Sequence, residues 1–338
     1  MMGSKIIAVI LVSLFVFFSS SGHCLMFSKN KTQFEWLATE TAPANYTMKI
    51  ISGTFYYHNE TGGLYVPTAA RINPGWGIGV STHVVGEEYK SLPDRLDIRF
   101  FSYTENKMYH GSFDLPYEKI LNLFKAGVKS NKDDPTFKKI MVGVAPGGVV
   151  AVWVTGYETR EVFFGKAKPY DGELTNSLDN VVENREEFVR RGLEDSLSSE
   201  ILTDIQKNGI PFGKWDNYRN QYSWIPTFAQ EQKPKYCNVA FFSGESYKIE
   251  FPLSSSMAKE LRHIPKQLSF GYFFKEKEWE MFFTVIFNEE EIFAAFDQLG
   301  NDEVINLEFD PKLPKTLTTV RVYNSKKSIQ LNKITQGR

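Results

Sequence analysis

The stretch that most restricts the fold is VGVAPGGVVAVWVTG at residues 142–156, where Pro146, Gly147 and Gly148 separate two β-branched runs. Proline at the second position and glycine at the third are typical of a type II turn, which needs a positive φ at the third position. The flanking runs are apolar on both faces, which indicates strands at the centre of a sheet. The sequence therefore predicts a hairpin of strands 140–145 and 149–155, with a third strand from Glu161.

The same glycines do not form a phosphate-binding loop. A Walker-type loop ends in lysine followed by serine or threonine, whereas Val149 and Val150 follow here. The strand-like alternation also leaves no helix N-terminus to hold an anion. The most glycine-rich stretch of the chain is therefore predicted to be architectural.

The first 22 residues are predicted to be a secretory signal peptide. Lys5 precedes an apolar run over residues 6–18, and small residues fill positions 19–22. The run is short for a membrane-spanning helix, so a membrane anchor is the weaker alternative. We expect a protein of the periplasm, or one anchored in the cell envelope.

The chain has two cysteines, Cys24 and Cys237. Cys24 follows the predicted signal peptide and is a candidate for lipidation, although His23 stands where lipidation favours a small residue. In an oxidising compartment Cys24 could instead pair with Cys237. The alternative for Cys237 is a buried, unpaired thiol within the strand-like segment KYCNVAFF.

The other elements predict an α+β protein built from two antiparallel-sheet units, each with a packed helix. A strand is expected over residues 46–58, a hairpin over 95–103 and 107–115, and a helix from Pro116 to Gly127. Helical spacing follows over 184–224 and a linker over 225–235. The units are placed at residues 25–183 and 236–338, and residues 184–235 join them.

The second unit is predicted to repeat part of the first. Sliding the chain by 172 positions brings residues 92–124 onto 264–296 without a gap, so that Pro93 meets Pro265 and Phe124 meets Phe296. A looser correspondence extends the match to about residue 168. The alternative is that two unrelated hairpin-and-helix patterns coincide.

No catalytic, cofactor-binding or metal-binding residues are predicted. The five histidines lack metal-ligand spacing, and there is no Gly-x-Ser-x-Gly motif. A formal net charge of −1 gives no general attraction to nucleic acid. We expect a protein that is not an enzyme; an unrecognised hydrolase would need a cleft of polar side chains, for example around His83 and His110.

Two aromatic stretches are candidates for partner binding. In PFGKWDNYRNQYSWIP, helical spacing would align Trp215, Tyr218 and Tyr222, with Trp224 just beyond; the alternative is packing of this helix on a sheet. The second is the long loop NPGWGIGVSTHVVG, and the alternative there is an ordered cover for a sheet edge. Its candidate residues are Trp76 and His83.

Several stretches resemble the bacterial domain of unknown function 2931, over about residues 34–228. They include FEWLATETAP, IISGTFYY, PGWGIGVSTHVVG, VGVAPGGVVAVWV and NGIPFGKWDNYRNQYSW, together with residues 92–120. The resemblance implies a Gram-negative envelope protein, with many lipoprotein-like members and no agreed catalytic residues. The family's genes often lie near type VI secretion effectors, which implies an immunity protein that binds a toxin. A periplasmic protein that binds lipid or cell wall is the alternative, and membrane contact is expected only through a lipid on Cys24.

Overall fold

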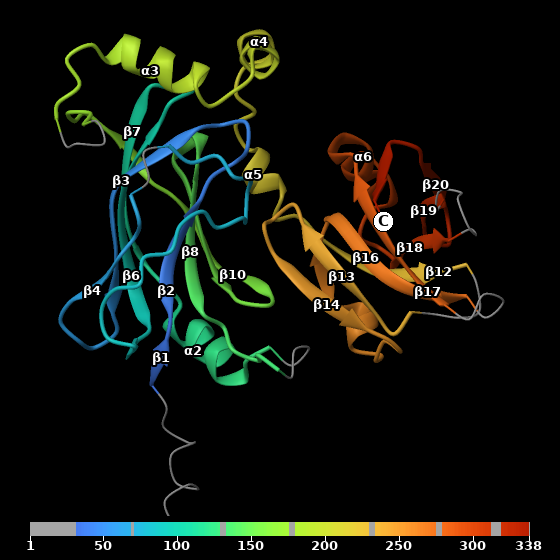
Figure 1. Cartoon of the computed structure of the whole chain (residues 1–338). Coiled ribbons are helices and arrows are strands. Elements are labelled where there is room, and N and C mark those ends of the chain that lie inside the picture. The colour runs from blue at the N-terminus through green and yellow to red at the C-terminus, as the bar shows by residue number, and fades with distance from the viewer. Residues whose placement is uncertain are drawn as a thin grey trace, which may run out of the picture.

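The chain forms two β-sandwiches, one after the other (Figure 1). The computed structural model describes residues 32–68, 71–128, 133–175, 180–229, 234–274, 279–311 and 319–337. The chain is 46% strand and 18% helical, so the expected α+β class is wrong. Large paired sheets supply both cores, and the helices contribute only short buried faces at their margins.

The first sandwich packs a five-stranded sheet against the strands of the predicted hairpin. The five-stranded sheet has the order β11(Lys168–Tyr170), β7(Lys107–Asp114), β6(Pro93–Ser102), β3(Met48–Tyr57), β4(Gly63–Tyr65). The facing strands are β2(Leu37–Thr41), β8(Lys139–Ala145), β9(Val149–Thr155) and β10(Thr159–Lys166). A short antiparallel pair, β1(Gln33–Glu35) with β5(Tyr89–Ser91), forms a separate two-stranded sheet. Helix α2(Tyr117–Ala126) adds its buried residues to this core.

The central hairpin is confirmed, and both of its faces are buried. Strands β8 and β9 pair from Lys139↔Thr155 to Ala145↔Val149, and Gly147 has the positive φ of 77° expected at its turn. One face points into the sandwich core, and the other carries Met141 and Trp153 beneath a partly buried Trp76. The two-sided apolar pattern therefore reflects packing on both sides of the sheet.

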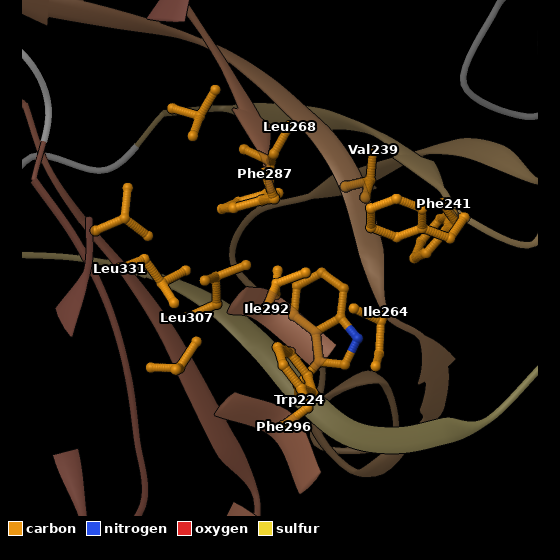
Figure 2. Close-up of a cluster of buried hydrophobic side chains, with 14 of the residues drawn as sticks. Trp224, Val239, Phe241, Ile264, Leu268, Phe287, Ile292, Phe296, Leu307 and Leu331 are labelled. Atoms are coloured by element: carbon orange, nitrogen blue, oxygen red, sulfur yellow. The ribbon is translucent and has the colours of Figure 1, made fainter. Parts of the chain in front are cut away.

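The second sandwich repeats this arrangement. Its first sheet has the order β14(Ser246–Glu250), β13(Tyr236–Phe241), β16(Pro265–Phe274), β17(Trp279–Phe287), β21(Ile334–Gly337). The facing sheet is β15(Leu261–His263), β12(Gln221–Phe228), β18(Ile305–Asp310), β19(Thr319–Tyr323), β20(Ser328–Leu331). Helix α6(Glu289–Leu299) corresponds to α2. Figure 2 shows how side chains such as Trp224, Leu268 and Phe296 fill the space between these sheets.

The correspondence between the halves is nearly residue for residue. Strands β5, β6, β7 and helix α2 begin 172 positions before β15, β16, β17 and α6, respectively. In each half the facing sheet contains one parallel strand pair, β2 with β8 or β12 with β18. The final strands, β11 and β21, likewise pair with β7 and β17.

A buried tryptophan makes the same hydrogen bonds in both halves. The indole N–H of Trp36 donates to the carbonyl of Ser91 (3.1 Å), and that of Trp224 donates to the carbonyl of His263 (2.9 Å). Each tryptophan carbonyl accepts from a buried cation, the Nζ of Lys90 or the Nη1 of Arg262. Such buried polar pairing is specific in geometry, so the two halves share detailed interactions as well as strand order.

The segment between the sandwiches differs from its prediction. Helices α3(Arg185–Glu194) and α4(Ser199–Asn208) form, and Ser198 and Gly209 cap α4, but α4 buries no residue. Helix α5 spans only Lys214–Asn217. The expected helix face through Tyr222 and the linker from 225 are wrong, because residues 221–228 form β12 with alternate residues buried.

The two sandwiches meet where β10 pairs with β14, which makes one nine-stranded sheet. Gly77 of the first half lies against Gly244 of the second, and a Cβ on Gly77 would lie 2.5 Å from the Gly244 Cα. Gly244 in turn lies over the Trp153 ring. Two glycines are needed here because the two backbones approach each other directly.

Replacing Gly77 with alanine should separate the two sandwiches. We expect Gly77→Ala to split thermal unfolding into two transitions and to increase the radius of gyration measured by X-ray scattering. The control is Gly209→Ala, which has a similar positive φ but open space around its Cβ, so it should cost only the backbone strain of about 1–3 kcal/mol. A single unchanged transition in Gly77→Ala would contradict this account of the junction.

Candidate functional site

A hollow lies between the two sandwiches, beside α5, and has a volume of about 170 Å³. The first half contributes the turn after β2 and the loop around Trp76, and the second contributes the end of β13 and the starts of β16 and α6. Its principal lining residues are Tyr46, Trp76, Lys214, Trp215, Tyr218, Phe242, Lys266 and Glu289. The site therefore requires both halves of the chain.

Aromatic rings form the wall of this hollow. The ring of Tyr46 meets that of Trp215 edge-on at 5.5 Å, and Trp76 lies 6.4 Å from Trp215. Trp76 also meets Trp153 edge-on at 5.0 Å, which ties the wall to the central hairpin. Contacts of this kind hold large side chains in fixed positions, so the wall is already shaped before any ligand enters.

Of the two lysines that line the hollow, one is paired with a carboxylate and the other is not. The Lys214 ammonium lies 2.9 Å from the Glu289 carboxylate. Burial raises the pKa of Tyr218, and the negative charge of Glu289 raises it further. Within the described ranges the Lys266 ammonium has no carboxylate partner. The hollow therefore presents one positive charge that an incoming anionic group could neutralise.

A second, wider hollow of about 570 Å³ adjoins the first across the Lys214–Glu289 ion pair. Phe212, which is 61% exposed, lies in its lining together with the partly buried Phe293. The two hollows share Lys214, Tyr218 and Glu289, so we treat them together as the junction groove.

The structure separates the predicted partner-binding residues. Trp76, Trp215 and Tyr218 come together at the junction groove, but Trp215 and Tyr218 are mostly covered. Tyr222 and Trp224 lie inside the second sandwich, where Trp224 is fully buried, so they cannot form an exposed face. Burial follows from their alternation along β12, and packing on a sheet is the interpretation that applies to them.

His83 lies apart from the groove residues, on the exposed surface of its loop, where its Nδ1 is 2.8 Å from the Tyr65 hydroxyl. His110 is bonded to Asp97 on the neighbouring strand (3.0 Å). The two histidines thus have different partners and form no shared polar cluster. In the part of the chain that the structure describes, no cluster of His, Cys, Asp and Glu could hold a metal ion.

Sequence reasoning missed the charged and exposed members of the groove: Phe212, Lys214, Lys266 and Glu289. Their types are ordinary, and only the return of the chain to the junction brings them together. The sequence offered one signal. The 172-position shift aligns Lys266 and Glu289 with Asp94 and Tyr117, so the two halves differ in charge at these positions.

Cys237 is buried in β13 and carries a free thiol, whose pKa is raised by burial. The candidate lipidation site Cys24 and the predicted signal peptide lie outside the described residues. Among the helices that the structure describes, none is long and apolar enough to cross a membrane.

A buried polar network lies at the same junction. The Glu161 carboxylate accepts from Arg219 Nε (2.7 Å), and the Glu161 backbone N–H donates to Glu245 (2.9 Å). Glu245 is also bonded to His263 Nδ1 (2.8 Å). Burial raises the pKa of Glu161 against the opposing charge of Arg219. This network ties β10 to the turn before β14, to the end of β15 and to the segment after α5.

A model of the family described as protein of unknown function (DUF2931) matches residues 26–213, which confirms the resemblance seen in the sequence. The match covers the first sandwich and helices α3 and α4, and ends just before α5. No curated protein and no solved structure matches the chain.

The junction network should make stability depend on pH through Glu245. Burial would raise the pKa of Glu245, but the hydrogen bond and charge of His263, together with the Glu161 N–H and the charge of Arg160, outweigh it and hold the pKa below its ordinary value of 4.5. The stabilisation from its charge is therefore present above about pH 4.5 and is lost as the pH falls through the lower folded pKa. Glu245→Gln should lower the free energy of unfolding by about 1–3 kcal/mol at pH 7.

This loss should shrink in acid, because the wild-type carboxyl then becomes protonated and neutral as well. Urea unfolding of both proteins at pH 7 and pH 3 measures the difference. The exposed Glu173→Gln is the control and should match the wild type at both values. A loss for Glu245→Gln that is equal at pH 7 and pH 3 would refute a role for its charge.

Proposed function

The chain belongs to the DUF2931 family of proteins of unknown function, and we propose that it is a non-enzymatic, exported protein that binds a partner protein in the junction groove. In its most concrete form, the proposal is an immunity-type protein that occludes a secreted toxin of the type VI kind. The junction groove carries this proposal, since it combines a fixed aromatic wall with an exposed phenylalanine and a lysine that has no carboxylate partner among the described residues.

The composition of the groove supports a protein ligand. Interfaces between proteins depend on a few aromatic and cationic anchors that fill pockets and are surrounded by polar groups. Phe212 offers an exposed anchor, and the smaller hollow has the volume of a single side chain. The polar rim includes Asn217, Asn288 and Glu290. The charge of Lys266 favours a partner that inserts an acidic side chain.

The packing of the cores favours this proposal over the lipid-binding alternative. A lipid carrier needs a large apolar cavity, usually inside a barrel or between sheets. Side chains fill the space between the sheets of the second half (Figure 2). The first half likewise has a continuous buried core across its two sheets.

Export is supported by the sequence alone, through the charged start, apolar run and small residues of positions 1–22. Export would place the groove in the periplasm or on the surface of an envelope membrane. This location matches the immunity role that the family resemblance implies.

The proposal is tested with residues 25–338, which leave out the predicted signal peptide and Cys24, against the product of the adjacent gene. We expect one-to-one binding that blocks the activity of that product, measured by calorimetry and an activity assay. Phe212→Ala and Lys266→Glu should each weaken binding by about tenfold to a hundredfold, because each removes an anchor.

Tyr157→Ala is the matched control, since Tyr157 is 54% exposed between β9 and β10 and does not line either hollow of the groove, and its binding should be unchanged. Failure of the wild-type chain to bind would count against an immunity role. Binding that survives both groove substitutions would instead show that the partner uses another surface.

A further inference from the structure

The first sandwich has a hollow at the position that α5 fills in the second. It lies between the end of β3, the start of β6 and the start of α2, and its volume is about 710 Å³. Three of its residues, His58, Asp94 and Tyr117, occupy the positions of Phe242, Lys266 and Glu289 in the other half. Backbone hydrogen bonds establish this correspondence. The backbone N–H of His58 donates to the carbonyl of Leu92, and that of Phe242 donates to the carbonyl of Ile264.

In the second half this position is occupied by α5. The Tyr218 ring lies 5.5 Å from Phe242 and 5.9 Å from Phe293, and Lys214 forms its ion pair with Glu289. A short segment that carries one cation and two aromatic rings therefore covers the end of the second sandwich. The site accepts such a segment through ring contacts and one charge pair.

In the first half the described chain places no helix over the hollow. His58 stacks on Tyr117 with the ring centroids 3.7 Å apart, and its Nδ1 lies 2.8 Å from Asp94. These two groups remain partly exposed, with side-chain exposures of 30% for His58 and 37% for Asp94. A stacked pair of rings, His58 and Tyr117, thus lies at the positions of Phe242 and Glu289, which contact α5 in the other half.

This hollow is lined mainly by negative charges, whereas the equivalent place in the second half carries the positive charge of Lys266. Its lining includes the carboxylates of Glu60, Asp94 and Asp114 and a single arginine, Arg95, which lies over the Tyr56 ring. Burial, and then the nearby charges of Glu118, Asp94 and Glu60, raise the pKa of Tyr117, as expected in a negative potential. An occupant would gain from positive charge and from a ring to stack.

We infer that this hollow, lined by His58, Asp94 and Tyr117, is a docking site for a short basic segment of a partner protein that carries an aromatic side chain. The segment would lie on the first sandwich as α5 lies on the second. This site is separate from the junction groove, so it does not depend on the function proposed above. The carboxylates attract the basic groups, and the His58–Tyr117 platform receives the ring.

The test uses a labelled peptide with the sequence of α5 and its neighbours, the segment 213–219 with the change Asp216→Lys (GKWKNYR), and the full mature chain. Fluorescence anisotropy at low salt measures binding, and the acidic peptide GEWENYE is the matched probe. We expect the basic peptide to bind and the acidic peptide to bind at least about tenfold more weakly. Binding of the basic peptide should weaken as salt is added.

Asp94→Lys should weaken binding of the basic peptide by about tenfold or more. The substitution gives the hollow a positive charge, as Lys266 does at the same position in the second half. The double variant Glu60→Gln/Asp114→Asn tests the same charge without disturbing the His58–Asp94 bond, and should also weaken binding. Asp171→Lys, an equal charge change at an exposed position elsewhere, is the control and should have little effect. Equal binding of both peptides, or equal losses in Asp94→Lys and Asp171→Lys, would overturn the inference.

Discussion

The direct contact of Gly77 with Gly244 above the Trp153 ring is the constraint on which the rest of the molecule depends. It lets β14 approach β10, so that two sandwiches share one nine-stranded sheet. It also places the loop around Trp76 beside α5, which creates the aromatic wall of the junction groove. The groove is therefore a consequence of how the halves join, and neither half could form it alone.

The same junction explains why equivalent positions in the two halves carry different residues. Met141 and Trp153 lie on the outer face of the first sandwich and are buried at the junction. Register places Glu308 and Arg321 at the same positions in the second sandwich, where they form an ion pair at the surface. The same two positions are thus apolar where the other half of the chain covers the sheet, and form an ion pair where the sheet faces solvent.

Much of this fold could be read from the sequence, because alternation and turn residues act locally. The hairpin around Gly147, the α2 helix and the 172-position correspondence all rest on such signals. Strand β12 was missed because its aromatic residues also fit a helical period, although Gln221-Tyr222-Ser223-Trp224 repeats Gln33-Phe34-Glu35-Trp36. The groove could not be predicted, since Phe212, Lys266 and Glu289 meet only through the tertiary arrangement.

Strand edges equivalent to the two that meet at the junction are also present at β4 and β20. Strand β20 corresponds to β10, and β4 corresponds to β14, so each end of the molecule carries one half of the junction. The polar network is missing there, because Gln330 occupies the position of Glu161 and Gly62 that of Glu245. Without paired charges and the Trp153 platform, a contact between copies would lack the interactions that hold the internal junction. The specificity of that junction therefore lies in its side chains and not in the exposed strand edges.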